Sequence, residues 1–392
     1  MQYSERKKRG KMLIFTGMLL FSIPFTPAQA LDQNAFIDSL KASVKPYQLE
    51  IPSAAVHQTD NNFVIEQATI KDTDNHFFDR LKLSNINING VSETDTGYNI
   101  NSFKIKTVSA ALKKADIVLS GLEADSFIIP KNGNAKPLDS LPAKKLSIAN
   151  IVAKIQNKDF LTASNVEVIS LLENNGIIHN IRVNCPDFTI AVGSIARPND
   201  IEMLKALNLE TLHGNTNYHF TIDKERNVFS MDESRFTIDQ LGSISITYHI
   251  KLEQDDLSKA QHLGNSAGAK TTQGDALKGF DLANIYLQDY KLRYEDQSFT
   301  NTALNYFVAE TGLPKETLSA LVRSVIASSV QENGNFAKEV DSALGTFLAK
   351  PQSLTIKLNP EQPVSLETIE ELSENDPFAI ISRLNVHVLA ND

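Results

Sequence analysis

One short segment carries the residue types of an enzymatic nucleophile. Residues 264–268, GNSAG, fit the pattern G-x-S-x-G, in which the serine lies on a strained turn between a buried strand and a helix. The preceding residues QDDLSKAQHL (254–263) are too polar for a buried strand, and the only histidine downstream is His387. We therefore interpret residues 254–279 as a flexible loop or linker. A serine hydrolase that uses Ser266 is kept as an alternative function.

The other residue types that often do chemistry form no recognisable site. Cys185 is the only cysteine, so no internal disulfide can form, and its strand-like surroundings predict a small, buried, apolar residue. The histidines show no metal-ligand spacing. The segment DTDNH (72–76) begins like a calcium-binding loop but lacks the glycine and the distal glutamate, which indicates a turn. The sequence thus predicts no catalytic residue, no metal ligand and no cofactor.

The first 30 residues have the layout of a secretory signal peptide. Basic residues between Arg6 and Lys11 precede an apolar run, residues 12–25, that is too short to span a bilayer. Ala28 and Ala30 then form an A-x-A cleavage site. We expect cleavage after Ala30 and a periplasmic location, with an uncleaved membrane anchor as the alternative. Because no later apolar run approaches the ~18 residues of a membrane span, we expect no integral membrane segment after cleavage.

The charge of the mature chain excludes one class of partner. The full chain has 38 basic and 47 acidic residues, of which residues 1–30 hold five and one, so the mature net charge is −13. An acidic surface repels nucleic acid, and anionic lipid headgroups do not attract it. The mature length allows one large domain or two ordinary ones.

A recurring change of phase is the strongest structural signal in the chain. Two runs with the period of a strand are separated by one extra residue, often next to an Asn, Gly, Ser or Asp. A β-bulge explains this pattern, because it adds one residue and returns the same face to the core; two short strands about a tight corner are the rival explanation. The eight segments with this pattern are 63–70, 81–88, 98–105, 117–124, 146–153, 161–168, 285–292 and 379–386.

The segment KKLSIANIVAKIQ (144–156) makes the expectation specific. A bulge would place its apolar residues on one face despite the change of phase, and it would set Ala149 and Asn150 opposite a single partner residue. In a straight strand the first two of these residues would point away from the last two. The apolar residues are Leu146, Ile148, Ile151 and Ile155.

These patterns predict an α+β fold that is mainly β, with coiled antiparallel sheets of bulged strands. No strand–helix–strand rhythm indicates a parallel sheet. Helical periodicity appears at 31–47, at 199–212 and three times within about 298–350, and we expect these last three helices to pack on one face of the sheet. We divide the mature chain into an N-terminal β-rich domain, 31–198, and a C-terminal β-rich domain, 199–392.

Two stretches of the C-terminal half carry a resemblance. IYLQDYKLRYEDQSFTNTALNYFVAETG (285–312) and FLAKPQSLTIKLNPEQPVSL (347–366) resemble a family of uncharacterised exported proteins of alphaproteobacteria, which brings no known catalytic residues. The rhythm of bulged strands is similar to that of AsmA-like envelope proteins, whose long coiled sheets form hydrophobic grooves for lipid. Those proteins usually keep a membrane anchor and are often longer, and this chain departs from both features.

The sequence therefore favours an exported, non-enzymatic periplasmic protein that binds an apolar ligand such as a lipid, or an envelope partner. The alternatives are the hydrolase that uses Ser266 and a purely structural envelope protein. The polar flanks of Ser266 favour the first of these functions over the hydrolase.

Overall fold

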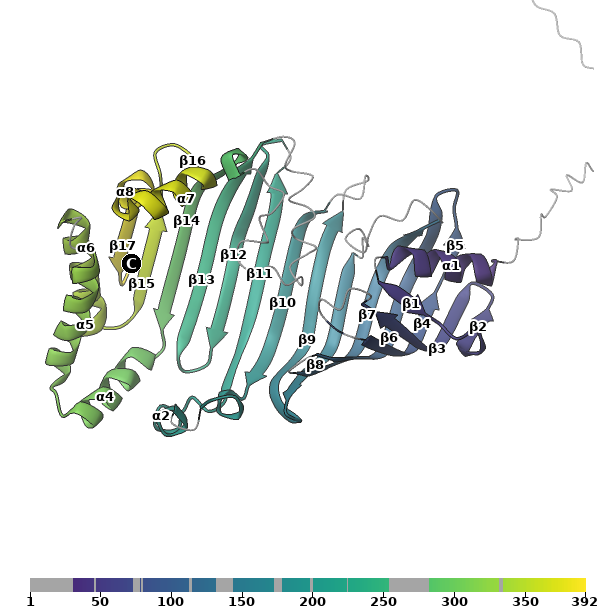
Figure 1. The fold of residues 1–392 in the computed structure, drawn as a ribbon, viewed down its shortest axis with the longest axis horizontal. Helices are drawn as coiled ribbons and strands as arrows, with labels where there is room; N and C mark the ends of the chain where they lie inside the picture. Colours follow the sequence, from purple (N-terminus) through teal and green to yellow (C-terminus); the bar gives the residue numbers. More distant parts are fainter. Residues whose placement is uncertain are drawn as a thin grey trace, which may run out of the picture.

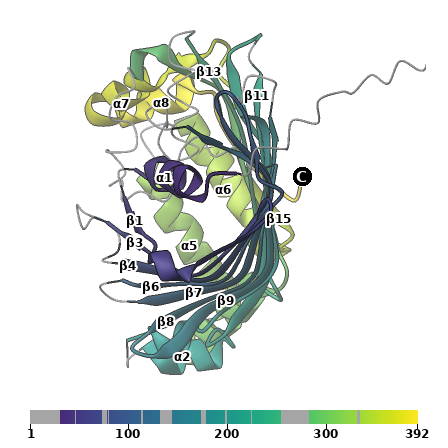
Figure 2. The same ribbon diagram turned by 90° about the vertical axis from the view of Figure 1, so that its right-hand side faces the viewer.

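A computed structural model shows one large antiparallel sheet with helices at both ends (Figure 1). The predicted signal peptide lies outside the described residues. Within the described residues, seventeen strands belong to this single sheet, which is strongly curved (Figure 2). The predicted fold, mainly β with a coiled antiparallel sheet, is confirmed. The structure describes residues 31–45, 47–72, 78, 80–112, 115–131, 144–172, 178–197, 200–223, 225–253, 282–330 and 334–392.

The strands form a meander in which neighbours in the chain are neighbours in the sheet. From β3 to β15 each strand pairs with the next, except that the two-residue strand β5 lies aside and β4 pairs with β6. At one end β1 and β2 both pair with β3, and at the other end β16 pairs with β14 and β17 with β15. The bounds are β1 Gln48–Glu50, β2 Val56–Thr59, β3 Asn62–Lys71, β4 Arg80–Asn89, β5 Ser92–Glu93, β6 Gly97–Ala111, β7 Asp116–Pro130, β8 Lys145–Ile155, β9 Lys158–Leu172, β10 Ile178–Ile190, β11 Leu212–Asp223, β12 Val228–Ile238, β13 Gly242–Leu252, β14 Ile285–Asp296, β15 Ser353–Leu358, β16 Val364–Ser365 and β17 Val386–Ala390.

A row of skipped residues crosses the N-terminal half of the sheet and accounts for the change of phase. In each of six neighbouring strands, one residue has no partner in the ladder of paired residues, and the pairing continues in the same register on both sides of it. We call these residues the skipped residues. On alternate strands this residue has a left-handed backbone, which asparagine and glycine tolerate best. The row consists of Glu66, Asn85 (φ 50°), Lys106, Gly121 (φ 62°), Ala149 and Asn165 (φ 53°).

The skipped row keeps apolar residues of β8 on one face, as predicted. Ile148 pairs with Leu122 and Ile151 pairs with Leu119, on either side of the skipped Ala149. Both leucines pack against the same core cluster. Directly paired residues point to the same side of a sheet, so Ile148 and Ile151 share that face.

The expected two-to-one bulge at Ala149 is wrong. Asn150 has a partner of its own on each side, Ser120 and Ser164. Ala149 lies against Gly121, where a Cβ would come within 2.8 Å of the Ala149 Cβ. The neighbouring strands β7 and β9 each have an unpaired residue opposite Ala149, namely Gly121 and Asn165. The extra residues therefore lie side by side, and the register is the same before and after them.

A two-to-one bulge occurs instead in the segment 285–292. Leu287 and Asp289 pair with the successive residues Ile250 and His249, so Gln288 is the extra residue. Such bulges increase the local twist, and they extend the coiling of the sheet into its C-terminal half.

The helix α1 (Gln33–Ser43) covers the N-terminal end of the concave face (Figure 2). The Asp32 carboxylate accepts hydrogen bonds from the backbone of its first turn. Phe36 of α1 is fully buried, with its ring centroid 4.5 Å from that of Phe63 and 5.3 Å from that of Tyr98. The main apolar core of the described chain lies between α1 and strands β3 to β7.

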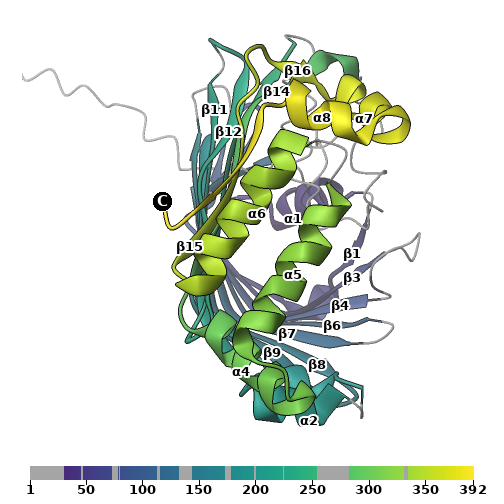
Figure 3. The same cartoon turned by 90° about the vertical axis from the view of Figure 1, so that its left-hand side faces the viewer.

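The three predicted C-terminal helices are α4 (Phe299–Thr311), α5 (Lys315–Ser329) and α6 (Gly334–Ala349), and they lie at the other end of the curve (Figure 3). Helix α6 packs Val340 and Leu344 onto Val388 of β17, which confirms the packing on the sheet for α6. Helix α5 lies against α6, and the Arg323 guanidinium donates two hydrogen bonds to the Asp341 carboxylate of α6.

The predicted strand at 379–386 is wrong. Residues Pro377–Arg383 form helix α8, and β17 begins only at Val386. Pro377 suits the first turn of a helix, and the Asp376 carboxylate accepts the backbone N–H of Ala379. The preceding helix α7 (Leu366–Asn375) was not predicted either.

The remaining helical segments are short. Helix α2 (Ile201–Ala206) is shorter than the predicted helix at 199–212, because the chain leaves the helix at Asn208, whose backbone is left-handed (φ 57°). The 3₁₀ turns are η1 (Ser53–Ala55), η3 (Val192–Ser194) and η5 (Leu282–Asn284). Strand β10 pairs with β11, so the ladder continues across the predicted domain boundary at 198/199, and the division into two folding units stays a prediction.

Candidate functional site

Rows of cross-strand partners trace one apolar face along the whole sheet. Partners point to the same side, so each row stays on one face. One row starts in the core beneath α1 and ends in the middle of the sheet. Its members are Ala68, Leu83, Val108, Leu119, Ile151, Ala163 and Phe188.

A second row continues this face to the C-terminal helices. Phe188 stacks on Phe236, with ring centroids 5.1 Å apart, and Phe236 pairs with Ile244. Ile244 pairs with Tyr294, which pairs with Leu354 in the cluster beneath α6. Figures 2 and 3 place α1 and α6 inside the same curve, so both rows lie on the concave face.

The middle of the concave face is apolar and only half-covered. Between the two helical ends its side chains keep part of their surface accessible, and Ile244 is 43% exposed. Four aromatic rings follow one another across β11, β12 and β13, with centroid distances of 6.3, 5.9 and 6.0 Å. They are Tyr218, Phe220, Phe229 and Tyr248. Burial raises the pKa of the Tyr248 phenol, as expected for a hydroxyl set in apolar surroundings.

The convex face is mainly polar, with single exposed apolar side chains such as Val64 and Ile128. Lys104 and Glu123 pair across β6 and β7 at 2.9 Å, and Lys145 and Glu167 pair across β8 and β9 at 2.6 Å. Exposed pairs of this kind contribute at most about 1 kcal/mol, so they mark a solvated surface more than a source of stability. The contrast between the faces locates the candidate functional site on the concave one.

A polar row on the convex face joins histidines and aspartates that are far apart in the sequence. The Asn180 amide lies 2.8 Å from His219 Nε2, and His219 Nδ1 lies 4.0 Å from Asp232. Asp232 lies 3.7 Å from His249 Nε2, and the other ring nitrogen of His249 is 2.9 Å from Asp289. Within the described part of the chain no group of three such side chains could hold a metal ion.

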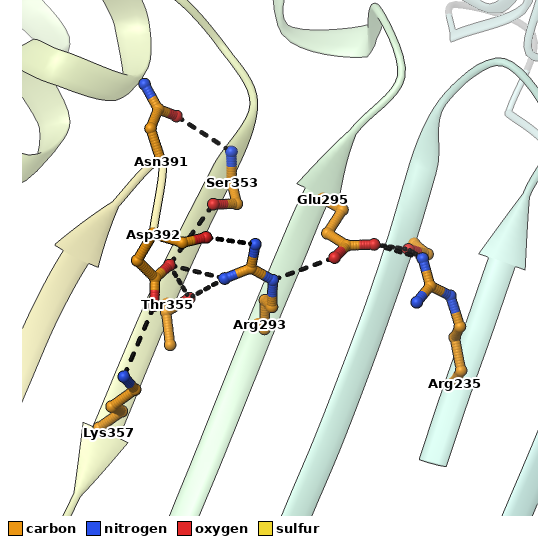
Figure 4. A network of polar contacts seen from close by, with 9 residues as sticks. Arg235, Arg293, Glu295, Ser353, Thr355, Lys357, Asn391 and Asp392 are labelled. Carbon is orange, nitrogen blue, oxygen red and sulfur yellow. Dashed lines mark hydrogen bonds and ion pairs between the residues drawn. The ribbon is translucent and has the colours of Figure 1, made fainter. Parts of the chain in front are cut away.

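A second polar network clamps the C-terminal strands on the convex face (Figure 4). The Arg293 guanidinium donates to Glu295 at 3.1 Å, to Thr355 at 3.2 Å and to the Asp392 side chain at 2.6 Å. Arg235 of β12 donates to the other oxygen of Glu295. The network therefore ties together β12, β14, β15 and the end of β17.

The two carboxylates of this network are held ionised. Burial alone would raise the pKa of Glu295, but hydrogen bonds from Arg293 and Arg235 outweigh it, and the pKa is lowered. Burial would likewise raise the pKa of Asp392, but the Thr355 hydroxyl and the neighbouring cations lower it. The hydroxyls of Ser243, Ser353 and Thr355 also donate to these carboxylates, so the network joins neighbouring strands of the sheet.

Among the described residues, Cys185 and His387 lie in separate parts of the fold. Cys185 is buried beside Phe188, as predicted, and burial raises the pKa of its thiol, which keeps it protonated and unreactive. Ser266 and the loop at 254–279 lie outside the described residues. His387 of β17 contacts Glu339 of α6 at 3.2 Å.

The comparison with protein families gives a match in the C-terminal part of the chain. A family model described as "Uncharacterized protein" matches residues 235–391. This stretch runs from β12 through the C-terminal helices to the end of β17, and it includes the two stretches that carry the resemblance. A search of curated proteins found no match. None of the helices in the described ranges has the length and apolar character that a membrane crossing requires.

Proposed function

We propose that this protein is an exported, non-enzymatic protein of the cell envelope that holds an apolar ligand, the acyl chain of a lipid, on its concave face. The observation that supports this most is the half-covered apolar surface between α1 and α6, at the centre of a sheet whose other face is mainly polar. Every exposed apolar Å² costs roughly 25 cal/mol, so a hydrocarbon chain that covered this surface would stabilise the complex.

The shape of the face favours an extended ligand. Rows of apolar side chains run across the strands, and neighbouring strands are about 4.8 Å apart. The aromatic rings from Tyr218 to Tyr248 form a continuous row across three strands. A flexible acyl chain can follow such a row and exchange water for carbon contacts along its length.

The location of the protein in the envelope is part of the proposal. The signal-peptide pattern of residues 1–30 and the likeness of the strand rhythm to AsmA-like proteins both favour it. In this setting the protein would carry or shield a lipid chain in the periplasm after removal of the signal peptide.

A matched pair of isoleucines tests the proposal. Ile244 on the concave face is 43% exposed, and Ile128 on the convex face, between the buried Phe127 and Ile129, is 47% exposed. Ile244→Asp should weaken the binding of cis-parinaric acid, measured by fluorescence titration, because the ligand would have to desolvate a carboxylate. Ile128→Asp should leave binding unchanged.

The same preparation tests for the natural ligand. Wild-type protein purified from its native envelope fraction should release lipid on solvent extraction, detected by mass spectrometry. Equal binding by both aspartate variants, together with no lipid in the extract, would contradict the proposal.

A further inference from the structure

Helix α5 carries an apolar stripe that no described part of the protein covers. The α5 stripe consists of Leu321, Val322, Val325 and Ile326, which are exposed by 50%, 40%, 64% and 39%. Apolar side chains at this spacing lie on one side of a helix, and such a stripe is normally buried. Its exposure therefore makes it a candidate contact surface.

The direction of the α5 stripe follows from Leu318. Leu318 precedes Leu321, Val322 and Val325 by three, four and seven residues, so all four lie along one helix face. Leu318 packs against the cluster around Phe347, to which Tyr294 of the concave face also belongs. The α5 stripe therefore continues from the contact between the helices and the concave face, and Figures 2 and 3 show α5 across the C-terminal mouth of the curve.

The chemistry of the α5 stripe fits hydrocarbon. Arg323 is the only charged residue between 317 and 330, and Asp341 neutralises it through two hydrogen bonds of 3.0 and 2.6 Å. Four half-exposed side chains offer on the order of 300 Å², well below the ~800 Å² per partner of a stable protein interface. A second copy of the chain would also have to cover polar surface around the stripe, whereas one acyl chain needs no more than the stripe itself.

We propose that the α5 stripe is the second wall of the lipid site. An acyl chain on the concave face beside Ile244 and Tyr294 would pass between the sheet and α5, with carbon contacts on both sides. This inference rests on the proposed function, because it assigns to α5 a part in binding the same ligand.

Site-specific photocrosslinking tests this wall. The photoreactive residue p-benzoylphenylalanine replaces Val325 on the α5 stripe, Ile244 on the concave face, or Val64 on the convex face, which is 41% exposed and serves as the control. The full mature chain is irradiated with vesicles of dioleoylphosphatidylethanolamine and then analysed by mass spectrometry. We expect severalfold more lipid adduct at positions 325 and 244 than at position 64.

The outcomes separate the two proposals. Adducts at 244 without adducts at 325 would overturn the α5 wall and leave the proposed function standing. No adduct above the control at either position would remove both. A crosslink from position 325 to a second copy of the chain would show that the α5 stripe is a self-association surface, which overturns the wall. Position 321 on the same stripe provides a second site if the substitution at 325 disturbs the fold.

Discussion

Gly121 has both a left-handed backbone and a crowded position, whereas Gly312 has only the left-handed backbone, so the two glycines separate these effects. Its φ of 62° disfavours a side chain, and a Cβ there would lie 2.8 Å from the Cβ of Ala149. Gly312, at the end of α4, has a φ of 69° with nothing within 4 Å of a built Cβ. Gly121→Ala should lower the free energy of unfolding by about 2–3 kcal/mol, and Gly312→Ala by only about 1 kcal/mol, measured by urea denaturation.

A double variant provides the control for this prediction. Ala149→Gly removes the clashing methyl group, so it should recover part of the loss caused by Gly121→Ala. Equal costs for the two alanine variants, or no recovery, would show that strand crowding at Gly121 is not a source of strain.

The skipped residues also show what could be predicted at the scale of single residues. Asn85, Gly121 and Asn165 each occupy the fifth position of a segment with a change of phase, and each is left-handed in the structure. The sequence did not indicate that Ala149 would be skipped without a left-handed backbone. Ala149 lies beside Gly121, which already has the left-handed backbone, and a single strand's sequence does not show which of two neighbours adopts it.

At the scale of elements, two phenylalanines on helices should differ sharply in their contribution to stability. Phe36 of α1 is fully buried against Phe63, whereas Phe307 of α4 is 47% exposed. Phe36→Ala should cost about 3–5 kcal/mol of unfolding free energy, because it leaves a cavity in the N-terminal core. Phe307→Ala should stay within about 0.5 kcal/mol. Similar costs in urea denaturation would mean that α1 does not anchor this end of the sheet.

The network around Arg293 should make the attachment of β17 sensitive to acid. The pKa values of Glu295 and Asp392 lie below their ordinary values of 4.5 and 3.8. Their contribution is therefore complete above those values and is lost as the pH falls through the lowered pKa values. Wild-type protein should lose more stability between about pH 5 and pH 3 than the Arg293→Gln variant, in which each carboxylate loses one of its two cations and keeps Arg235 or Lys357.

A surface arginine supplies the comparison for the acid prediction. Arg226 makes a 3.7 Å contact with Asp223 and is largely exposed, so Arg226→Gln should retain the wild-type pH profile of the urea midpoint. If Arg293→Gln retained that profile as well, the network would not couple to stability.

The elements themselves were predictable where periodicity was long. The three helices within 298–350 carry wide apolar stripes and were found, and the evenly spaced strands that start near 63, 81, 98 and 117 form the predicted meander. The segment 379–386 failed because its apolar residues fit both periods, and the helix cap at Asp376 decided between them. The histidine–aspartate row could not be predicted, since its members come from five strands.

At the scale of the whole molecule, export is the first prediction to check. The protein recovered from the periplasmic fraction without detergent should begin at Leu31, because the A-x-A site ends at Ala30. N-terminal sequencing provides the measurement. A chain that begins at Met1, or one recovered only in detergent, would contradict the predicted cleavage.

The candidate site depends on information that exists only in the folded chain. The sequence indicates that Ile148, Ile151 and Ile244 are strand residues, but exposed isoleucines such as Ile128 look the same in a one-dimensional pattern. Which face stays half-covered is decided by where α1 and α6 pack, and those contacts join different helices and strands of the chain. The open middle of the concave face is therefore a property of the tertiary structure.

The alternation along the skipped row sets a rule for how such a molecule could change its length. Left-handed residues occur at β4, β7 and β9, and the strands between them lack one at this level. If one strand were added or lost, two strands with a left-handed skipped residue, or two without one, would become neighbours. Every later strand would also run in the opposite direction. A hairpin added or lost preserves both the alternation and the direction. Lengthening by one hairpin would add about 10 Å, two strand spacings, to the apolar face. Natural variants of this sheet should thus differ from one another by even numbers of strands.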